Sequence, residues 1–171
     1  MARLEVSTVV HVPPDRLFER LVDFEGYPAY STHLDAVERD GDGRAGTVYA
    51  ITASWWRLSR TVRSEVTAVD PPSRIDWRLL GPIEATGAWT VESTEAAHPD
   101  PSSRLELVVE YEPSTLGAVD LPLGVTGDWL TERLVPVVER EARQVCTRLV
   151  AELEGERREV DLEVRLADQP S

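Results

Sequence analysis

The chain has 171 residues, 42% of them hydrophobic, which fits one globular domain rather than a disordered or fibrous chain. Its single cysteine excludes an internal disulfide framework, and its formal charge of −13 disfavours nucleic acid, because an acidic surface repels the phosphate backbone. The sequence shows no secretory signal and no apolar run as long as a membrane span, so we expect a cytoplasmic protein without a transmembrane segment.

The N-terminal part predicts a strand followed by short helices. Segment 4–12 alternates apolar and polar residues, as a half-buried strand does. Pro13 and Pro14 suit the first turn of a helix, and apolar residues then recur at helical spacing up to Gly26, which predicts an amphipathic helix of roughly three turns. Segment 27–33 is too short and too interrupted for more than a stub helix.

Turn-forming residues divide the middle of the chain in the manner of a β-meander. Between these turns we expect strands near 34–40, 46–56, 58–69, 74–80, 83–94 and 104–112. In several of them apolar residues alternate with charged ones, which is typical of an antiparallel sheet with one face in water.

A long helix follows. Apolar residues recur at helical spacing from about 128 to 154, with Thr126 or Asp128 as N-cap, and Gly155 ends the pattern. Pro136 lies inside the pattern and should kink the helix or mark its true start.

The C-terminal tail is the least expected segment. Residues 159–167 alternate again, so we assign 1–155 to the domain and 156–171 to a C-terminal extension with a possible extra strand. The apolar face of that strand needs cover, which a sheet edge or the second subunit of a homodimer would provide.

These elements together predict an α+β fold. A curved antiparallel sheet of about seven strands should wrap around the long C-terminal helix, with two short helices after the first strand. Since one helix cannot fill the width of such a sheet, we expect a cavity between sheet and helix.

Four segments and the long helix, in this order, resemble the START-like (SRPBCC) superfamily, in particular its polyketide cyclase/dehydrase and coenzyme Q-binding branch. The segments are Val-Pro-Pro-Asp-Arg-Leu-Phe (12–18), Asp-Phe-Glu-Gly-Tyr-Pro-Ala-Tyr (23–30), Val-Asp-Pro-Pro-Ser-Arg-Ile (69–75) and Gly-Pro-Ile-Glu-Ala-Thr-Gly-Ala-Trp (81–89). The resemblance spans roughly residues 3 to 154 and implies a helix-grip fold with a hydrophobic cavity for a lipophilic small molecule. The alternating tail departs from the family pattern.

The resemblance leaves three functions open. A carrier or chaperone of a lipid, an isoprenoid quinone or a polyketide-like molecule leads, because the Tyr-Pro-x-aromatic and Gly-Pro segments look most like the quinone-binding branch. A polyketide-type aromatase/cyclase or dehydratase is the enzymatic alternative, and a protein-interaction module is the third. A titratable pair in the pocket would favour catalysis, an apolar lining would favour carriage, and Trp55 or Trp56 exposed in an apolar patch would favour a partner protein.

The candidate ligand-binding residues are aromatic, apolar or polar side chains that should face the cavity. They are Tyr27, Tyr30, His33, Trp55, Arg60, Val62, Trp77, Leu79, Trp89, Val109, Leu134 and Val138. Adjacent Trp55 and Trp56 point to opposite faces of a strand, so only one of them can line the cavity.

Each polar candidate has a structural alternative. Arg60 shares the apolar face of its strand, where a guanidinium would mark a polar headgroup or an internal carboxylate, but a local bulge would turn it into water. Tyr27, Tyr30 and His33 could orient a carbonyl or, for His33, act as a general base; packing of the tyrosines and exposure of His33 is the alternative that we favour.

No catalytic residue can be assigned from the sequence. The three histidines are scattered without metal-ligand spacing, so we expect no metal and no cofactor. Cys146 lies on the long helix and is interpreted as a small buried apolar group rather than a nucleophile.

The charge pattern predicts a halophilic protein. All 18 basic residues are arginine against 31 acidic residues. GC-rich coding explains the missing lysine, but adaptation to high salt explains the acid excess as well, since salt screens carboxylate repulsion.

Overall fold

A computed structural model describes residues 2–29, 34–55, 58–95, 99–118, 127–156 and 158–168. Its centre is one antiparallel sheet of eight strands in the order β2-β3-β4-β5-β6-β7-β1-β8. The strands are β1 (Ala2–Val10), β2 (Leu34–Asp40), β3 (Val48–Trp55), β4 (Leu58–Asp70), β5 (Arg74–Leu80), β6 (Ala85–Thr94), β7 (Ser102–Tyr111) and β8 (Glu163–Asp168). The predicted strands are therefore present, and the tail raises the number from about seven to eight.

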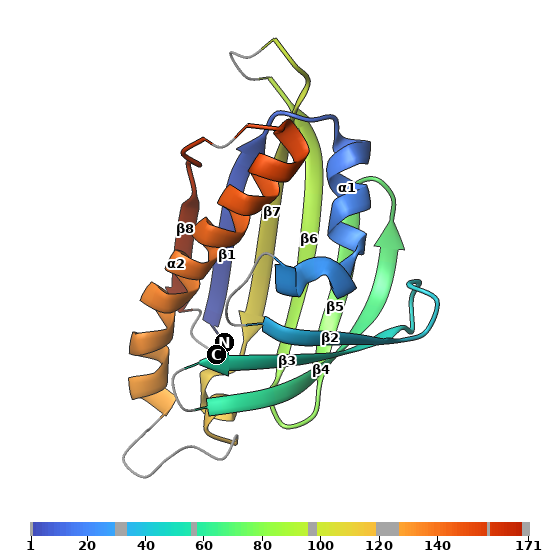
Figure 1. Cartoon of the computed structure of the whole chain (residues 1–171). Helices are drawn as coiled ribbons and strands as arrows, with labels where there is room; N and C mark the ends of the chain where they lie inside the picture. Colours follow the sequence, from blue (N-terminus) through green and yellow to red (C-terminus); the bar gives the residue numbers. More distant parts are fainter. Residues whose placement is uncertain are drawn as a thin grey trace.

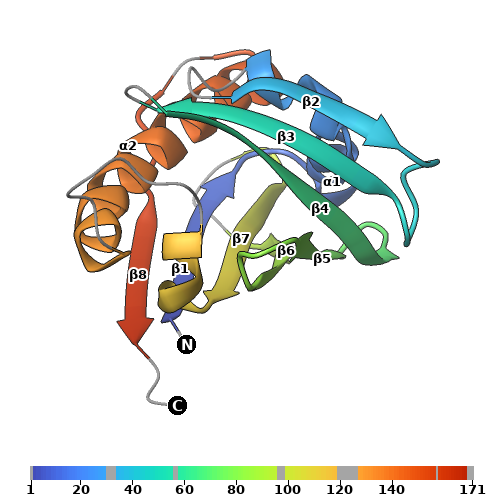
Figure 2. The ribbon, with the colours of Figure 1, turned by 90° about the horizontal axis from the view of Figure 1, so that it is seen from below.

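The helices lie on the concave side of the curved sheet (Figures 1 and 2). They are α1 (Pro14–Val22), the 3-10 turns η1 (Phe24–Ala29) and η2 (Pro113–Ala118), and α2 (Gly127–Glu154). The long helix α2 runs through Pro136, so this proline does not mark its start. This arrangement confirms the predicted α+β helix-grip fold.

Alternation sorts the side chains of the sheet into an inner and an outer face. On β5, Ile75 is fully buried on the inner face, whereas Arg74 and Arg78 are exposed on the outer face. The register places Ile75 opposite Trp89 of β6 and Val69 of β4, which continues the apolar inner face across three strands.

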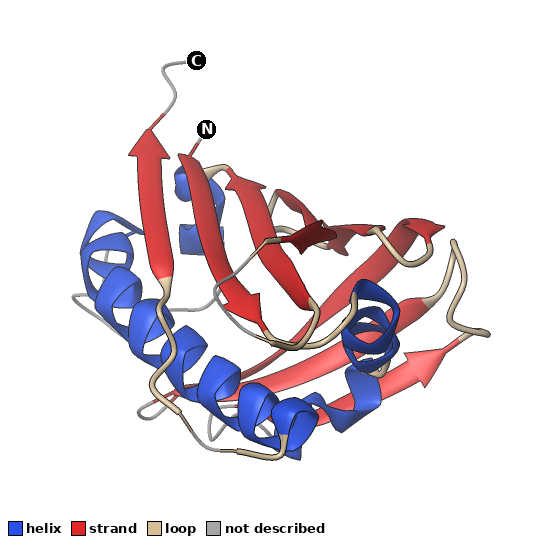
Figure 3. Cartoon of the chain, turned by 90° about the horizontal axis from the view of Figure 1, so that it is seen from above, coloured by secondary structure: helices blue, strands red, loops and turns tan. Residues whose placement is uncertain are grey.

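The buried core fills one end of the space between sheet and helices. There α1 and the C-terminal turns of α2 pack on the inner face of the sheet, as Figure 3 shows from above. Its fully or nearly fully buried members include Val10, Leu17, Phe18, Leu21, Val66, Ile75, Val91, Leu105, Cys146, Leu149, Val150 and Leu153. On α2, Val145 is partly buried and also packs against this core.

The tail pairs with the sheet edge of its own chain. Strand β8 runs antiparallel to β1 and begins at Glu163, later than predicted, because the preceding segment instead buries Val160 in the core. Arg158 anchors the crossing, since its Nε lies 2.8 Å from Oε1 of Glu154 and its Nη2 donates to the carbonyl oxygen of Val9. Burial of Glu154 opposes its ionisation, but hydrogen bonds from Arg158 and from the His11 backbone outweigh this and lower the pKa of Glu154.

Candidate functional site

A cavity of about 200 Å³ lies beside the core, between η1 and the inner face of the sheet. Strands β2 to β6 and η1 supply the walls. The described residues that line it are Phe24, Tyr27, Leu34, Val37, Tyr49, Ile51, Ser64, Val66, Trp77, Leu79 and Trp89. Five of these eleven side chains are aromatic, and none carries a charge at neutral pH.

Edge-to-face contacts fix the aromatic end of the cavity. The ring centroid of Phe24 lies 5.1 Å from that of Tyr27 and 4.8 Å from that of Tyr49, and the interplanar angles are 66° and 61°. These are favourable aromatic geometries. The 3-10 turn η1, which brings Phe24 and Tyr27 to β3, therefore closes the cavity on this side.

The hydroxyl of Tyr27 is already used by the protein. It donates a hydrogen bond of 2.5 Å to the backbone carbonyl oxygen of Leu21, at the end of α1. Burial of this hydroxyl, with a further contribution from the charge of Asp23, raises the pKa of Tyr27. Tyr27 thus presents its ring to the cavity, while its hydroxyl proton is bonded within the protein.

The ring of Trp77 packs closely against the backbone of Gly87. Gly87 lies directly opposite Trp77 in the β5–β6 pairing. A Cβ atom on Gly87 would overlap the six-membered ring of the indole, so the close approach depends on the missing side chain. Trp77 and Leu79, two residues further along β5, then form one wall of the cavity.

The structure brings together some of the predicted site residues. Tyr27, Trp77, Leu79 and Trp89 line the cavity. Val62 and Val109 are half-buried on the same inner face, opposite Ile51 and Gly87 respectively, but are not among its lining residues.

The remaining predicted residues do not contribute to the described lining. Arg60 is exposed, its guanidinium donates to the carbonyl oxygen of Ser59, and it is not among the described lining residues. Tyr30 and His33 lie outside the described residues, as do the side chains of Trp55, Leu134 and Val138.

Seven described lining residues are not among the predicted candidates, namely Phe24, Leu34, Val37, Tyr49, Ile51, Ser64 and Val66. Tyr49 and Ile51 share one face of β3 by simple alternation, so this signal was present in the sequence. Leu34 and Val37 are three residues apart, and only a register irregularity between Leu34 and Ala36 allows both to face inward.

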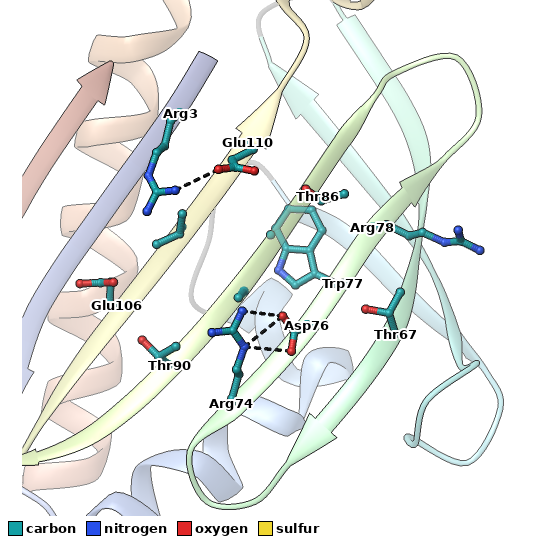
Figure 4. Close-up of a pocket in the computed structure, with 13 residues that line it drawn as sticks. Arg3, Thr67, Arg74, Asp76, Trp77, Arg78, Thr86, Thr90, Glu106 and Glu110 are labelled. Carbon is teal, nitrogen blue, oxygen red and sulfur yellow. Dashed lines mark hydrogen bonds and ion pairs between the residues drawn. The ribbon is translucent and has the colours of Figure 1, made fainter. Parts of the chain in front are cut away.

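The outer face of the sheet, on β1 and β4 to β7, carries a different pocket, a charged groove of about 410 Å³ (Figure 4). Its arginines are paired with acidic neighbours. Nη1 of Arg3 lies 2.9 Å from Oε1 of Glu110, and Nη2 of Arg74 lies 2.8 Å from Oδ1 of Asp76. Trp77 is the one described residue that borders both the groove and the cavity.

Other chemistry-bearing groups are separate from the cavity. Burial raises the pKa of the Cys146 thiol to about 11, so it stays protonated at neutral pH. The described residues include no group of three or more His, Cys, Asp or Glu side chains that could hold a metal ion.

No helix in the described part of the chain is both long and apolar enough to cross a membrane.

Solved structures share this architecture. The Zhui aromatase/cyclase from Streptomyces sp. R1128 is 22% identical with a TM-score of 0.69, over 90% of this chain and 94% of that one. A START superfamily protein from Mycobacterium smegmatis is 16% identical with a TM-score of 0.62, over 91% and 99%. The di-domain aromatase/cyclase BexL is 14% identical with a TM-score of 0.62, over 90% of this chain and 51% of BexL. At these identities the likeness shows the shared fold.

Comparison with curated protein sequences finds no significant match. The family model described as polyketide cyclase/dehydrase and lipid transport matches residues 1–154, which is most of the chain and stops where the tail begins. The chain therefore belongs to this family, within the START-like (SRPBCC) superfamily.

Proposed function

We propose that the protein binds a flat, hydrophobic small molecule in the cavity between η1 and the sheet, and that it acts as a carrier or chaperone of that molecule. The observation that carries this proposal is the lining, which combines aromatic rings from η1, β3, β5 and β6 with aliphatic side chains. Such concave apolar sites favour ligands whose surface is mostly hydrocarbon.

The size of the cavity suggests the size of the ligand. Its volume of about 200 Å³ lies below the ~300–1,000 Å³ of drug-sized sites. An engineered apolar cavity of ~150 Å³ binds benzene. We therefore expect one ring or two fused rings inside, with any isoprenoid chain of a quinone or lipid outside the described walls.

Carriage is favoured over catalysis by the charge of the lining. The described walls contain no carboxylate, imidazole or guanidinium, and the predicted candidate Arg60 is exposed. General acid–base chemistry needs a titratable group within hydrogen-bond reach of the substrate, and the hydroxyl of Tyr27, one of the two tyrosines of the lining, already donates to the backbone of Leu21. The protein-interaction alternative rested on Trp55 and Trp56, whose side chains lie outside the described residues.

The cyclase alternative has one specific support. The family description includes polyketide cyclase and dehydrase, and two of the similar structures are aromatase/cyclases. Incubation with a linear poly-β-ketone thioester separates the two functions. Because such chains also cyclise without an enzyme, the protein-free reaction is the reference. A carrier should leave its ring products unchanged and should not accelerate their formation, whereas a cyclase should form a ring product faster or with a different ring pattern, as detected by mass spectrometry.

Binding is tested with tetramethyl-1,4-benzoquinone, a one-ring quinone that cannot add a thiol because its ring is fully substituted. We expect saturable quenching of indole fluorescence, since Trp77 and Trp89 form part of the wall. Calorimetry then compares Leu79→Trp, which fills the cavity, with Leu80→Trp, which adds the same volume on the other face of β5.

Loss of binding in Leu79→Trp and its retention in Leu80→Trp would support the cavity as the site. Equal binding by both variants, or no saturable binding by the wild-type protein, would contradict the proposal. Circular dichroism of each variant shows that the fold is retained.

A further inference from the structure

One wall of the cavity carries a hydroxyl group. Ser64, on β4, is only 8% exposed and is the one non-aromatic polar residue among the described lining residues. Its register partners, Tyr49 on β3 and Leu79 on β5, also line the cavity, so Ser64 lies in the middle of this wall.

The Ser64 hydroxyl has no hydrogen-bond partner among the residues that the structure describes. This distinguishes it from the other short polar side chains of the inner core. Ser103, for example, donates to the carbonyl oxygen of Val12 over 2.7 Å, and Thr8 donates to that of Asp161 over 2.8 Å.

Neither tyrosine of the lining places an available hydroxyl at the centre of this wall. That of Tyr27 donates to the carbonyl oxygen of Leu21. That of Tyr49 lies beside Gly43, in the turn that joins β2 to β3 and away from the centre of the wall. Ser64 is thus the hydroxyl that faces the cavity without a partner of its own.

The Ser64 Oγ is not fully buried but keeps surface open to the cavity, where water or a bound molecule can hydrogen-bond to it. Valine would satisfy this wall better, and valine indeed occupies positions 62 and 66, the neighbours of Ser64 on the same face. A serine there becomes favourable once a bound molecule supplies the partner.

Building on the proposed function, we propose that Ser64 binds an oxygen atom on the ring of the ligand. The ligand class is then an oxygenated aromatic or quinonoid ring rather than a plain hydrocarbon. A serine hydroxyl can donate to a carbonyl oxygen and can also accept from a ring hydroxyl. The aromatic walls hold the ring, and Ser64 selects its orientation.

The test uses two ligands that differ in one carbonyl group, 1-tetralone and tetralin. Calorimetry gives the dissociation constant of each for the wild-type protein and for Ser64→Ala. We expect the preference for the ketone, taken as the ratio of the two constants, to fall by roughly fivefold to tenfold in Ser64→Ala, the range of one neutral hydrogen bond. Tetralin itself should bind both proteins about equally.

Two further variants serve as controls. Ser64→Thr keeps a hydroxyl on a residue suited to a strand and should retain most of the ketone preference. Ser59→Ala removes an exposed serine from the same strand and should leave the ratio unchanged.

The outcomes separate this inference from the function on which it rests. If both ligands bind but Ser64→Ala has the wild-type ratio, the role of Ser64 is wrong while hydrophobic binding stands. If neither ligand binds the wild-type protein, the proposed function is wrong, and the inference is overturned with it.

Discussion

The two faces of the sheet differ in chemistry although β4, β5 and β6 contribute to both. The inner face near η1 holds an aromatic cavity without charged groups among its described residues, whereas the outer face holds a groove with three arginines and three carboxylates. On β5, Asp76 and Arg78 line only the groove and Leu79 lines only the cavity, whereas Trp77, between them, borders both.

This difference shows which face is suited to specific binding of a hydrophobic molecule. The arginines of the outer groove form ion pairs with neighbouring carboxylates, in a setting partly open to solvent where each pair contributes little. The inner cavity contains buried aromatic surface and an unpaired hydroxyl, which are features that a ligand can satisfy.

The largest difference between the faces should appear in stability at two adjacent residues. Ile75→Ala removes a side chain that is 0% exposed, and should reduce the free energy of unfolding by about 2–5 kcal/mol. Asp76→Ala removes an outer-face carboxylate paired with Arg74, and should cost less than about 1 kcal/mol. Urea denaturation measures both. Similar losses for the two variants would contradict the division into a packed and a solvated face.

A smaller effect is expected where the inner face depends on a glycine. Gly87→Ala places a methyl group in the position of the Trp77 ring, and should destabilise the fold by about 1–3 kcal/mol through overpacking. The near-ultraviolet circular dichroism of the indole should change with it.

The double variant Gly87→Ala/Trp77→Val provides the control for this contact. With the ring removed, the added methyl group should cost much less than in the wild-type background. An equal cost in both backgrounds would show that Trp77 does not pack on Gly87.

The outer surface should dominate the response to salt. Because the chain has 31 acidic and only 18 basic residues, we expect salt to stabilise the fold by screening carboxylate repulsion more than it destabilises the fold by weakening ion pairs. The melting temperature should rise between low salt and molar KCl by about 3 °C, which corresponds to about 1 kcal/mol for a chain of this size. A melting temperature that does not change with KCl would remove the halophilic interpretation.

Much of the fold follows from local patterns in the sequence. Alternation predicted the meander strands, and helical periodicity with Gly155 predicted the end of α2 at Glu154. The tail strand was predicted from alternation alone, whereas its pairing with β1 depends on contacts between residues far apart in the chain.

The candidate site was harder to predict. Alternation placed Trp77, Leu79 and Trp89 on the inner face, where they line the cavity. It also placed Arg60 on that face, but alternation does not reveal where the cover over a strand ends, and Arg60 is exposed. The irregularity in β2 that turns Val37 inward and the missing partner of Ser64 are visible only in three dimensions.

The most direct test of the account is to locate a bound ligand by nuclear magnetic resonance. Protein labelled at the methyl groups of Ile, Leu and Val is titrated with tetramethyl-1,4-benzoquinone, and intermolecular nuclear Overhauser effects are recorded. We predict contacts from the quinone methyl groups to Ile51, Val66 and Leu79 in the cavity, and none to Val108 in the outer groove. Contacts to Val108 without contacts to Ile51 and Leu79 would contradict the central claim that the cavity is the binding site.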